Sequence, residues 1–81
     1  MELRELSTEE TAEVLKRDLS AHVHVPREHL VELAWHADVP PTGYHTEVFH
    51  DTDGREYALY VKDGGSDVAG GYEVMDSPYP P

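Results

Sequence analysis

The sequence predicts an α+β fold in which two N-terminal helices pack on a small antiparallel β-hairpin or three-stranded meander. Two stretches with helical spacing of apolar residues fill the first half of the chain, and two alternating stretches around an Asp-Gly turn signal follow. The 81 residues suffice for one small domain. We expect this domain over residues 1–63, followed by a flexible tail over residues 64–81, rich in Gly, Pro and Ser, with a third strand at 72–75 as an option.

The first helix is predicted over residues 8–19. Ser7, followed three residues later by Glu10, has the pattern of a capping box, in which a hydroxyl and a carboxylate satisfy free amides at the helix start. Residues 21–25 alternate apolar and polar side chains, so we expect a short strand or an extended linker there. The apolar face of the helix comprises Thr8, Ala12, Leu15 and Leu19.

The second helix is predicted over residues 26–37. Pro26 suits the first turn of a helix, where a missing amide hydrogen costs nothing. The pair Pro40-Pro41 ends the element soon after. An apolar stripe with i, i+3, i+4, i+7 spacing runs between them and is widened by two more apolar residues: Leu30, Leu33, Ala34 and Ala37, with Val31 and Trp35.

Residues 44–50 and 55–62 are predicted to form the hairpin. A two-residue turn at Asp53-Gly54 pairs His50 with Tyr57 and sorts the strands into two faces. The helices are then expected to cover the mostly apolar face, which leaves Phe49 and Tyr60 near each other on the opposite face. The residues assigned to the covered face are Tyr44, Thr46, Val48, His50, Tyr57, Leu59 and Val61.

Composition and motifs argue against several classes of function. With 17 Asp and Glu against 6 Lys and Arg, the net charge is −11, which disfavours direct binding to nucleic acid or to an anionic membrane. No apolar run reaches the roughly 18 residues of a membrane span, so a cytoplasmic protein is the default expectation. Cysteine is absent, and the chain lacks the nucleophile-elbow and phosphate-loop motifs. We therefore assign no catalytic residues and expect a protein that is not an enzyme.

The aromatic residues suggest a function in protein contact. Phe49 and Tyr60 are expected to form an exposed aromatic pair rimmed by carboxylates, which is a reasonable protein-binding patch. The sequence thus predicts a small acidic interaction module, regulatory in role, that binds another protein with a basic surface or a second copy of itself as a homodimer. The predicted contact residues are Trp35, Tyr44, Glu47, Phe49, Glu56 and Tyr60.

Histidines give a first alternative. In an extended segment, His22 and His24 project to the same side, which is a usable spacing for metal ligands, and His50 is a candidate third ligand. Such a site of nitrogen and oxygen ligands suits divalent zinc or nickel. The competing interpretation is that these are ordinary surface histidines and that the protein has no cofactor.

The acidic residues give a second alternative. Carboxylates crowd the two predicted helices, and such a surface can mimic nucleic-acid charge, as viral-type inhibitors do. The competing interpretation is solvation, because many carboxylates, few lysines and no Ile or Asn resemble the composition of proteins from high-salt organisms. An acidic protein from a GC-rich genome has the same composition.

Overall fold

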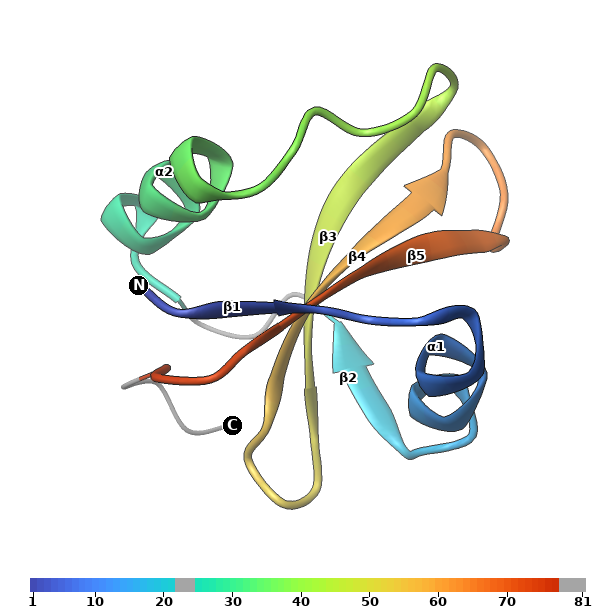
Figure 1. Ribbon diagram of the computed structural model, residues 1–81, viewed down its shortest axis with the longest axis horizontal. Helices are drawn as coiled ribbons and strands as arrows, with labels where there is room; N and C mark the ends of the chain where they lie inside the picture. Colours follow the sequence, from blue (N-terminus) through green and yellow to red (C-terminus); the bar gives the residue numbers. More distant parts are fainter. Residues whose placement is uncertain (22–24, 78–81) are drawn as a thin grey trace.

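A computed structural model describes residues 1–21 and 25–77. In this part of the chain, a five-stranded antiparallel sheet carries two helices (Figure 1). The strand order across the sheet is β1-β5-β4-β3-β2. The elements are β1 (Leu3–Glu5), α1 (Thr8–Leu15), β2 (Leu19–Ala21), α2 (Arg27–His36), β3 (Tyr44–Asp51), β4 (Glu56–Lys62) and β5 (Val68–Val74).

The chain is α+β, but the predicted sheet of two or three strands with a flexible tail is wrong. Strands β1 and β2 have three residues each, which is too short for an alternating pattern to stand out in the sequence. Strand β5 contains Gly70 and Gly71 and therefore has the composition of a tail, yet it lies between β1 and β4. The division predicted after residue 63 falls in the connection between two paired strands, β4 and β5.

The turn of the β3–β4 hairpin has three residues, not the predicted two. The amide of Asp51 donates to the carbonyl of Arg55 over 3.0 Å, and the amide of Gly54 donates back to the carbonyl of Asp51 over 3.1 Å. Gly54 has φ of +84°, as the last position of a three-residue hairpin loop requires. The change from two to three loop residues shifts the register by one, and a shift of one moves side chains to the opposite face.

The observed register separates the residues that were predicted to lie together. Phe49 pairs with Tyr57, whereas Tyr60 pairs with Thr46. Residues of directly opposed pairs share a face, and successive residues alternate between faces. Phe49 and Tyr60 therefore lie on opposite faces of the sheet, and the predicted exposed aromatic pair does not form.

Helix α1 covers the face with the larger core. The predicted capping box is confirmed: the Ser7 hydroxyl accepts from the amide of Glu10 over 3.1 Å, and the Glu10 carboxylate accepts from the amide of Ser7 over 3.0 Å. The helix ends at Leu15, before the predicted end, because the chain turns there into β2. The core beneath it comprises Leu6, Val14, Tyr57, Leu59 and Val61, with Leu19, Phe49 and Val68 packed against it.

Helix α2 covers the opposite face, which corrects the expectation that both helices share one face (Figure 1). Its smaller core comprises Leu33, Ala58 and Val74, with Met1, Leu3 and Val48 packed against it. Only His29 and Leu33 of this helix are buried. Most of the predicted apolar stripe of α2 therefore does not enter the core.

Gly71 explains why one of the glycines in β5 belongs to the sheet. A Cβ atom at this position would lie 2.2 Å from the carbonyl oxygen of Ala58, and φ of Gly71 is +149°. Only glycine combines this close approach with this backbone conformation. Beyond this point the pairing of β4 and β5 shifts register between Leu59 and Val61.

Candidate functional site

The side of α2 turned away from the sheet is apolar and exposed. Leu30 and Val31 are 44% and 47% exposed, and Trp35 is 84% exposed. Because 3.6 residues make a turn, these three residues and Ala34 share one broad arc beside the line from His29 to Leu33 that faces the sheet. We call this arc, made of Leu30, Val31, Ala34 and Trp35, the α2 surface.

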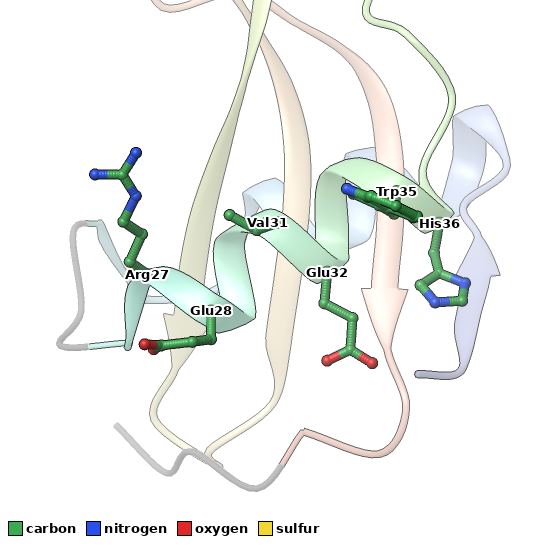
Figure 2. A pocket seen from close by; sticks show the side chains of 6 residues that line it. All are labelled: Arg27, Glu28, Val31, Glu32, Trp35 and His36. Carbon is green, nitrogen blue, oxygen red and sulfur yellow. The ribbon is translucent and has the colours of Figure 1, made fainter.

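A shallow hollow of about 410 Å³ lies on the outer side of α2 (Figure 2). Figure 2 shows the carboxylates of Glu28 and Glu32 along one flank of the helix, with Val31 and Trp35 on the other. An apolar surface with charges at its rim is typical of protein contacts. The hollow is lined by Arg27, Glu28, Val31, Glu32, Trp35 and His36.

A second hollow of about 430 Å³ lies between α2 and strand β3. We call it the β3 groove. Leu30 and Ala34 belong to both this groove and the α2 surface, so the apolar area continues from the helix down to the sheet. The groove is lined by Leu30, Leu33, Ala34, Ala37, Asp38, Val39, Pro40, Thr46 and Val48.

Two tyrosines fix one wall of the β3 groove. The hydroxyl of Tyr72 donates to the carboxylate of Asp38 over 3.0 Å, and the hydroxyl of Tyr60 donates to the carbonyl of Asp38 over 3.2 Å. The two rings meet edge to face, with centroids 6.1 Å apart. Burial, together with the hydrogen bond to Tyr72, raises the pKa of Tyr60, so its hydroxyl remains a donor. These contacts hold the segment after α2 against the sheet.

Beside the groove, alternate residues of β3 bond to β4. Within the described residues, strand β2 pairs with Phe49, His50 and Asp51 of β3. Hydrogen bonds from the amide of Asp63 to the carbonyl of Gly43, and from the amide of Asp51 to the carbonyl of Arg55, show that odd-numbered residues of β3 bond to β4.

Thr46 and Val48 consequently direct their amides and carbonyls away from β4. Among the described residues, no strand pairs with β3 residues 44–48 on that side. The backbone groups of Thr46 and Val48 that face away from β4 lie next to the groove, because both residues also line the groove.

The structure does not bring the six predicted contact residues together. Trp35 alone lies on the α2 surface. Tyr60 is engaged with Asp38, and Tyr44 begins β3 with its amide bonded to the carbonyl of Pro41. The others lie apart: Phe49 packs on the α1-side core, Glu56 is fully buried and Glu47 lies 2.7 Å from a ring nitrogen of His45.

Sequence reasoning missed a buried cluster around Glu56. One carboxylate oxygen lies 2.5 Å from Nε2 of His29, and the other lies 3.2 Å from Nε2 of His50 and accepts from the hydroxyl of Ser77 over 2.6 Å. The cluster joins α2, β3, β4 and the segment after β5. The three partners lie 6 to 27 positions from Glu56 in the chain, so no local motif marks the cluster.

The predicted metal ligands are not seen as a set. His50 is buried in the Glu56 cluster, and its Nδ1 has no hydrogen-bond partner in the described part of the chain. His22 and His24 lie outside the described residues. Within residues 1–21 and 25–77, no group of three or more His, Asp and Glu side chains is arranged to hold a metal ion.

A polar groove on the α1 side gathers three of the four arginines. Arg4 pairs with Glu10 and Glu73, and Arg17 pairs with Asp51 over 3.2 Å. The carboxylates in the groove outnumber the guanidinium groups, so its charge does not favour an anionic ligand. The charged lining residues are Arg4, Arg17, Arg55, Glu9, Glu10, Glu13 and Glu73.

Neither α1 nor α2, the helices of the described residues, is long and apolar enough to cross a membrane. Comparison with family models, with curated proteins and with solved structures finds no match for this chain. Its function has to be argued from the chemistry of its surfaces.

Proposed function

We propose that the chain is a small, non-enzymatic protein-binding module whose α2 surface holds a partner protein. The observation that carries the proposal is Trp35, a large aromatic side chain that is 84% exposed at one end of the apolar arc of α2. Burial of such an arc in a complex removes apolar area from water, at about 25 cal/mol per Å². Tryptophan is also the residue type most often found at the energetic centre of protein contacts.

The charge of the chain favours a basic partner. The net charge is −11, and carboxylates of Glu28, Glu32 and Asp38 lie at the rim of the α2 surface and in the adjoining groove. A segment that combines apolar residues with Lys or Arg complements both features. A second copy of this chain would bring another charge of −11, so self-association is the less favoured occupant.

The test compares capture of partner proteins by wild type and by two variants. Trp35→Ser removes the most exposed apolar side chain of the α2 surface, whereas Leu15→Ser removes from α1 an apolar side chain that is 46% exposed. The captured protein is then purified and titrated against each form, with fluorescence of Trp35, the single tryptophan, as the signal for wild type and Leu15→Ser and calorimetry for all three.

We expect Trp35→Ser to weaken binding at least about thirtyfold, as expected for a hot spot of 2 kcal/mol, with Leu15→Ser within about twofold of wild type. Equal affinity of Trp35→Ser and wild type contradicts the proposal. Absence of a blue shift in the Trp35 emission on binding also contradicts the proposal.

A further inference from the structure

We infer that the partner presents an α-helix to the outer side of α2, with an arginine of that helix seated in the hollow between Trp35 and the carboxylates of Glu28 and Glu32. The inference rests on the proposed function, because it states which structure and which side chain the α2 surface receives. It is carried by the spacing and the chemistry of the residues that line the hollow.

The lining of the hollow has the spacing of a helix–helix contact. Glu28, Val31, Glu32 and Trp35 lie at positions i, i+3, i+4 and i+7 of α2. Four residues at this spacing surround the hole that receives one side chain of a facing helix. Figure 2 shows that the two apolar residues form one side of this hole and that the two carboxylates lie on the other. The side chain that enters therefore meets an apolar wall and a charged wall.

A helix fits the outer side of α2 better than an extended segment does. Between the ends of α2, amides and carbonyls bond within the helix, so its outer side offers a partner only side chains. A facing helix presents its own side chains three and four positions apart, which matches the rows on α2. Apolar residues next to the arginine then pack across Val31 onto Leu30 and Ala34, which are exposed.

Arginine fits both walls of the hollow. Its planar guanidinium stacks on an indole ring, and its five N–H donors bind carboxylates in a fork. Glu28 and Glu32 are about 6 Å apart along the helix axis, so a guanidinium between them faces both. Oε1 of Glu32 also lies 3.7 Å from the main-chain nitrogen of Met1, which makes Glu28 the stronger charged partner. The guanidinium of Arg27 points away from both carboxylates (Figure 2).

A second copy of this chain is the competing occupant. Arg27 precedes Leu30 by three positions and Val31 by four, so α2 itself carries an arginine beside apolar residues. Each copy has a net charge of −11, and contact between two α2 helices brings the carboxylates of both together. A basic helix from another protein removes this repulsion. We therefore assign the hollow to the arginine of such a helix.

The first test uses a synthetic peptide, (Leu-Ala-Gln-Arg-Ala-Ala-Gln)₂-Leu-Ala, with blocked ends, titrated into ¹⁵N-labelled protein. The indole signal of Trp35, the single tryptophan, is expected to shift, with a dissociation constant below about 1 mM. Citrulline at both arginine positions keeps the shape without the charge and is expected to weaken binding at least about tenfold, and lysine at least about threefold. An arginine peptide that does not bind, or a citrulline peptide that binds equally well, overturns the inference.

A fourth peptide tests the helical conformation. Glycine at the sixth position of each repeat, on the side turned away from the leucines and arginines, lowers the helix content and leaves every contact side chain in place. It is expected to weaken binding at least about threefold, because more of the helix has to form on binding. Equal or tighter binding of the glycine peptide means that the segment is not bound as a helix and overturns the inference.

Two double variants of the protein test the charged wall. Glu28→Gln with Glu32→Gln removes both carboxylates of the hollow and leaves Trp35 in place. Glu9→Gln with Glu13→Gln removes the same charge at the same spacing from exposed positions of α1 and is the matched control. The first variant is expected to weaken binding of the arginine peptide and of the captured partner at least about tenfold, and the control less than about threefold.

The outcomes separate this inference from the proposed function. If Trp35→Ser weakens binding of the captured partner while the two double variants bind it equally, the inference fails and the proposed function stands. If Trp35→Ser does not weaken that binding, both fail. A wild-type dimer that Arg27→Gln converts to a monomer assigns the hollow to a second copy and overturns the inference.

Discussion

Glu56 determines how α2 is attached to the sheet. Its carboxylate is inaccessible to solvent and lies within 3.2 Å of both His29 and His50. Removal of one member of a buried, hydrogen-bonded polar group leaves the others unsatisfied. The cluster explains why a helix that buries only two of its residues keeps its position.

We expect Glu56→Ala to lower the free energy of unfolding by about 3 kcal/mol, measured by urea denaturation. Glu47→Ala, which removes a half-buried carboxylate from the neighbouring strand, serves as the control and is expected to cost no more than about 1 kcal/mol. Similar losses for the two variants would show that the buried cluster does not anchor α2.

Asp51 stabilises the turn of the β3–β4 hairpin. Burial would raise its pKa, but hydrogen bonds from the amide of Arg55, the hydroxyl of Tyr57, the amide of Asp53 and the guanidinium of Arg17 outweigh burial, so the pKa of Asp51 is lowered. A carboxylate with a lowered folded-state pKa stabilises the fold above its unfolded pKa, near 3.9. That contribution declines as pH falls through the folded-state value.

We therefore expect Asp51→Asn to be less stable than wild type by about 2 kcal/mol at pH 7 and to approach wild-type stability as pH falls below about 4. Urea denaturation at several pH values measures the difference. Asp67→Asn, at an exposed position, is the control. A difference between Asp51→Asn and wild type that stays constant from pH 7 to pH 2.5 would contradict this account.

Helix α2 buries Leu33 in the core and exposes its other large apolar residues to solvent. Leu33 is 3% exposed in the core, whereas Leu30, three residues earlier, lies at the mouth of the β3 groove. Leu33→Ala is expected to lower the free energy of unfolding by about 3 kcal/mol and Leu30→Ala by less than about 1 kcal/mol. Chemical denaturation compares the two. A large loss for Leu30→Ala would mean that the α2 surface serves stability instead of binding.

Elements with strong local signals could be predicted from the sequence. The capping box at Ser7 begins α1 as expected, α2 lies within one residue of its predicted bounds and both hairpin strands were identified. The pairing of β1 and β2 depends on contacts with strands distant in the chain, so it could not be predicted. The length of the turn was wrong because Asp53-Gly54 occurs in both two-residue and three-residue hairpin loops.

The candidate site was predicted only in part, because it depends on the whole molecule. Trp35 was selected from its type and its place at the rim of a helical stripe. The β3 groove depends on the face of the sheet that α2 covers, which does not follow from local sequence. The error of one residue in the turn placed Phe49 and Tyr60 on the same face of the predicted hairpin, whereas the observed register places them on opposite faces. The predicted aromatic patch on the hairpin was therefore wrong.

The net charge of −11 acts on the whole molecule. Repulsion among 17 carboxylates is weakly screened at low ionic strength, because the Debye length is about 30 Å at 0.01 M and about 3 Å at 1 M. We expect the thermal unfolding midpoint to rise steadily as KCl increases over this range, measured by circular dichroism. A matched series with a neutral osmolyte controls for solvent exclusion. A midpoint that falls or stays constant with KCl would show that self-repulsion does not limit stability.

Titration of a captured partner protein into wild type and Trp35→Ser tests the central claim, that the α2 surface holds a partner. Wild type is expected to bind at least about thirtyfold more tightly than Trp35→Ser, with a blue shift of the Trp35 emission on binding. Equal affinity of the two forms would contradict the claim, because it would mean that the exposed Trp35 lies outside the contact.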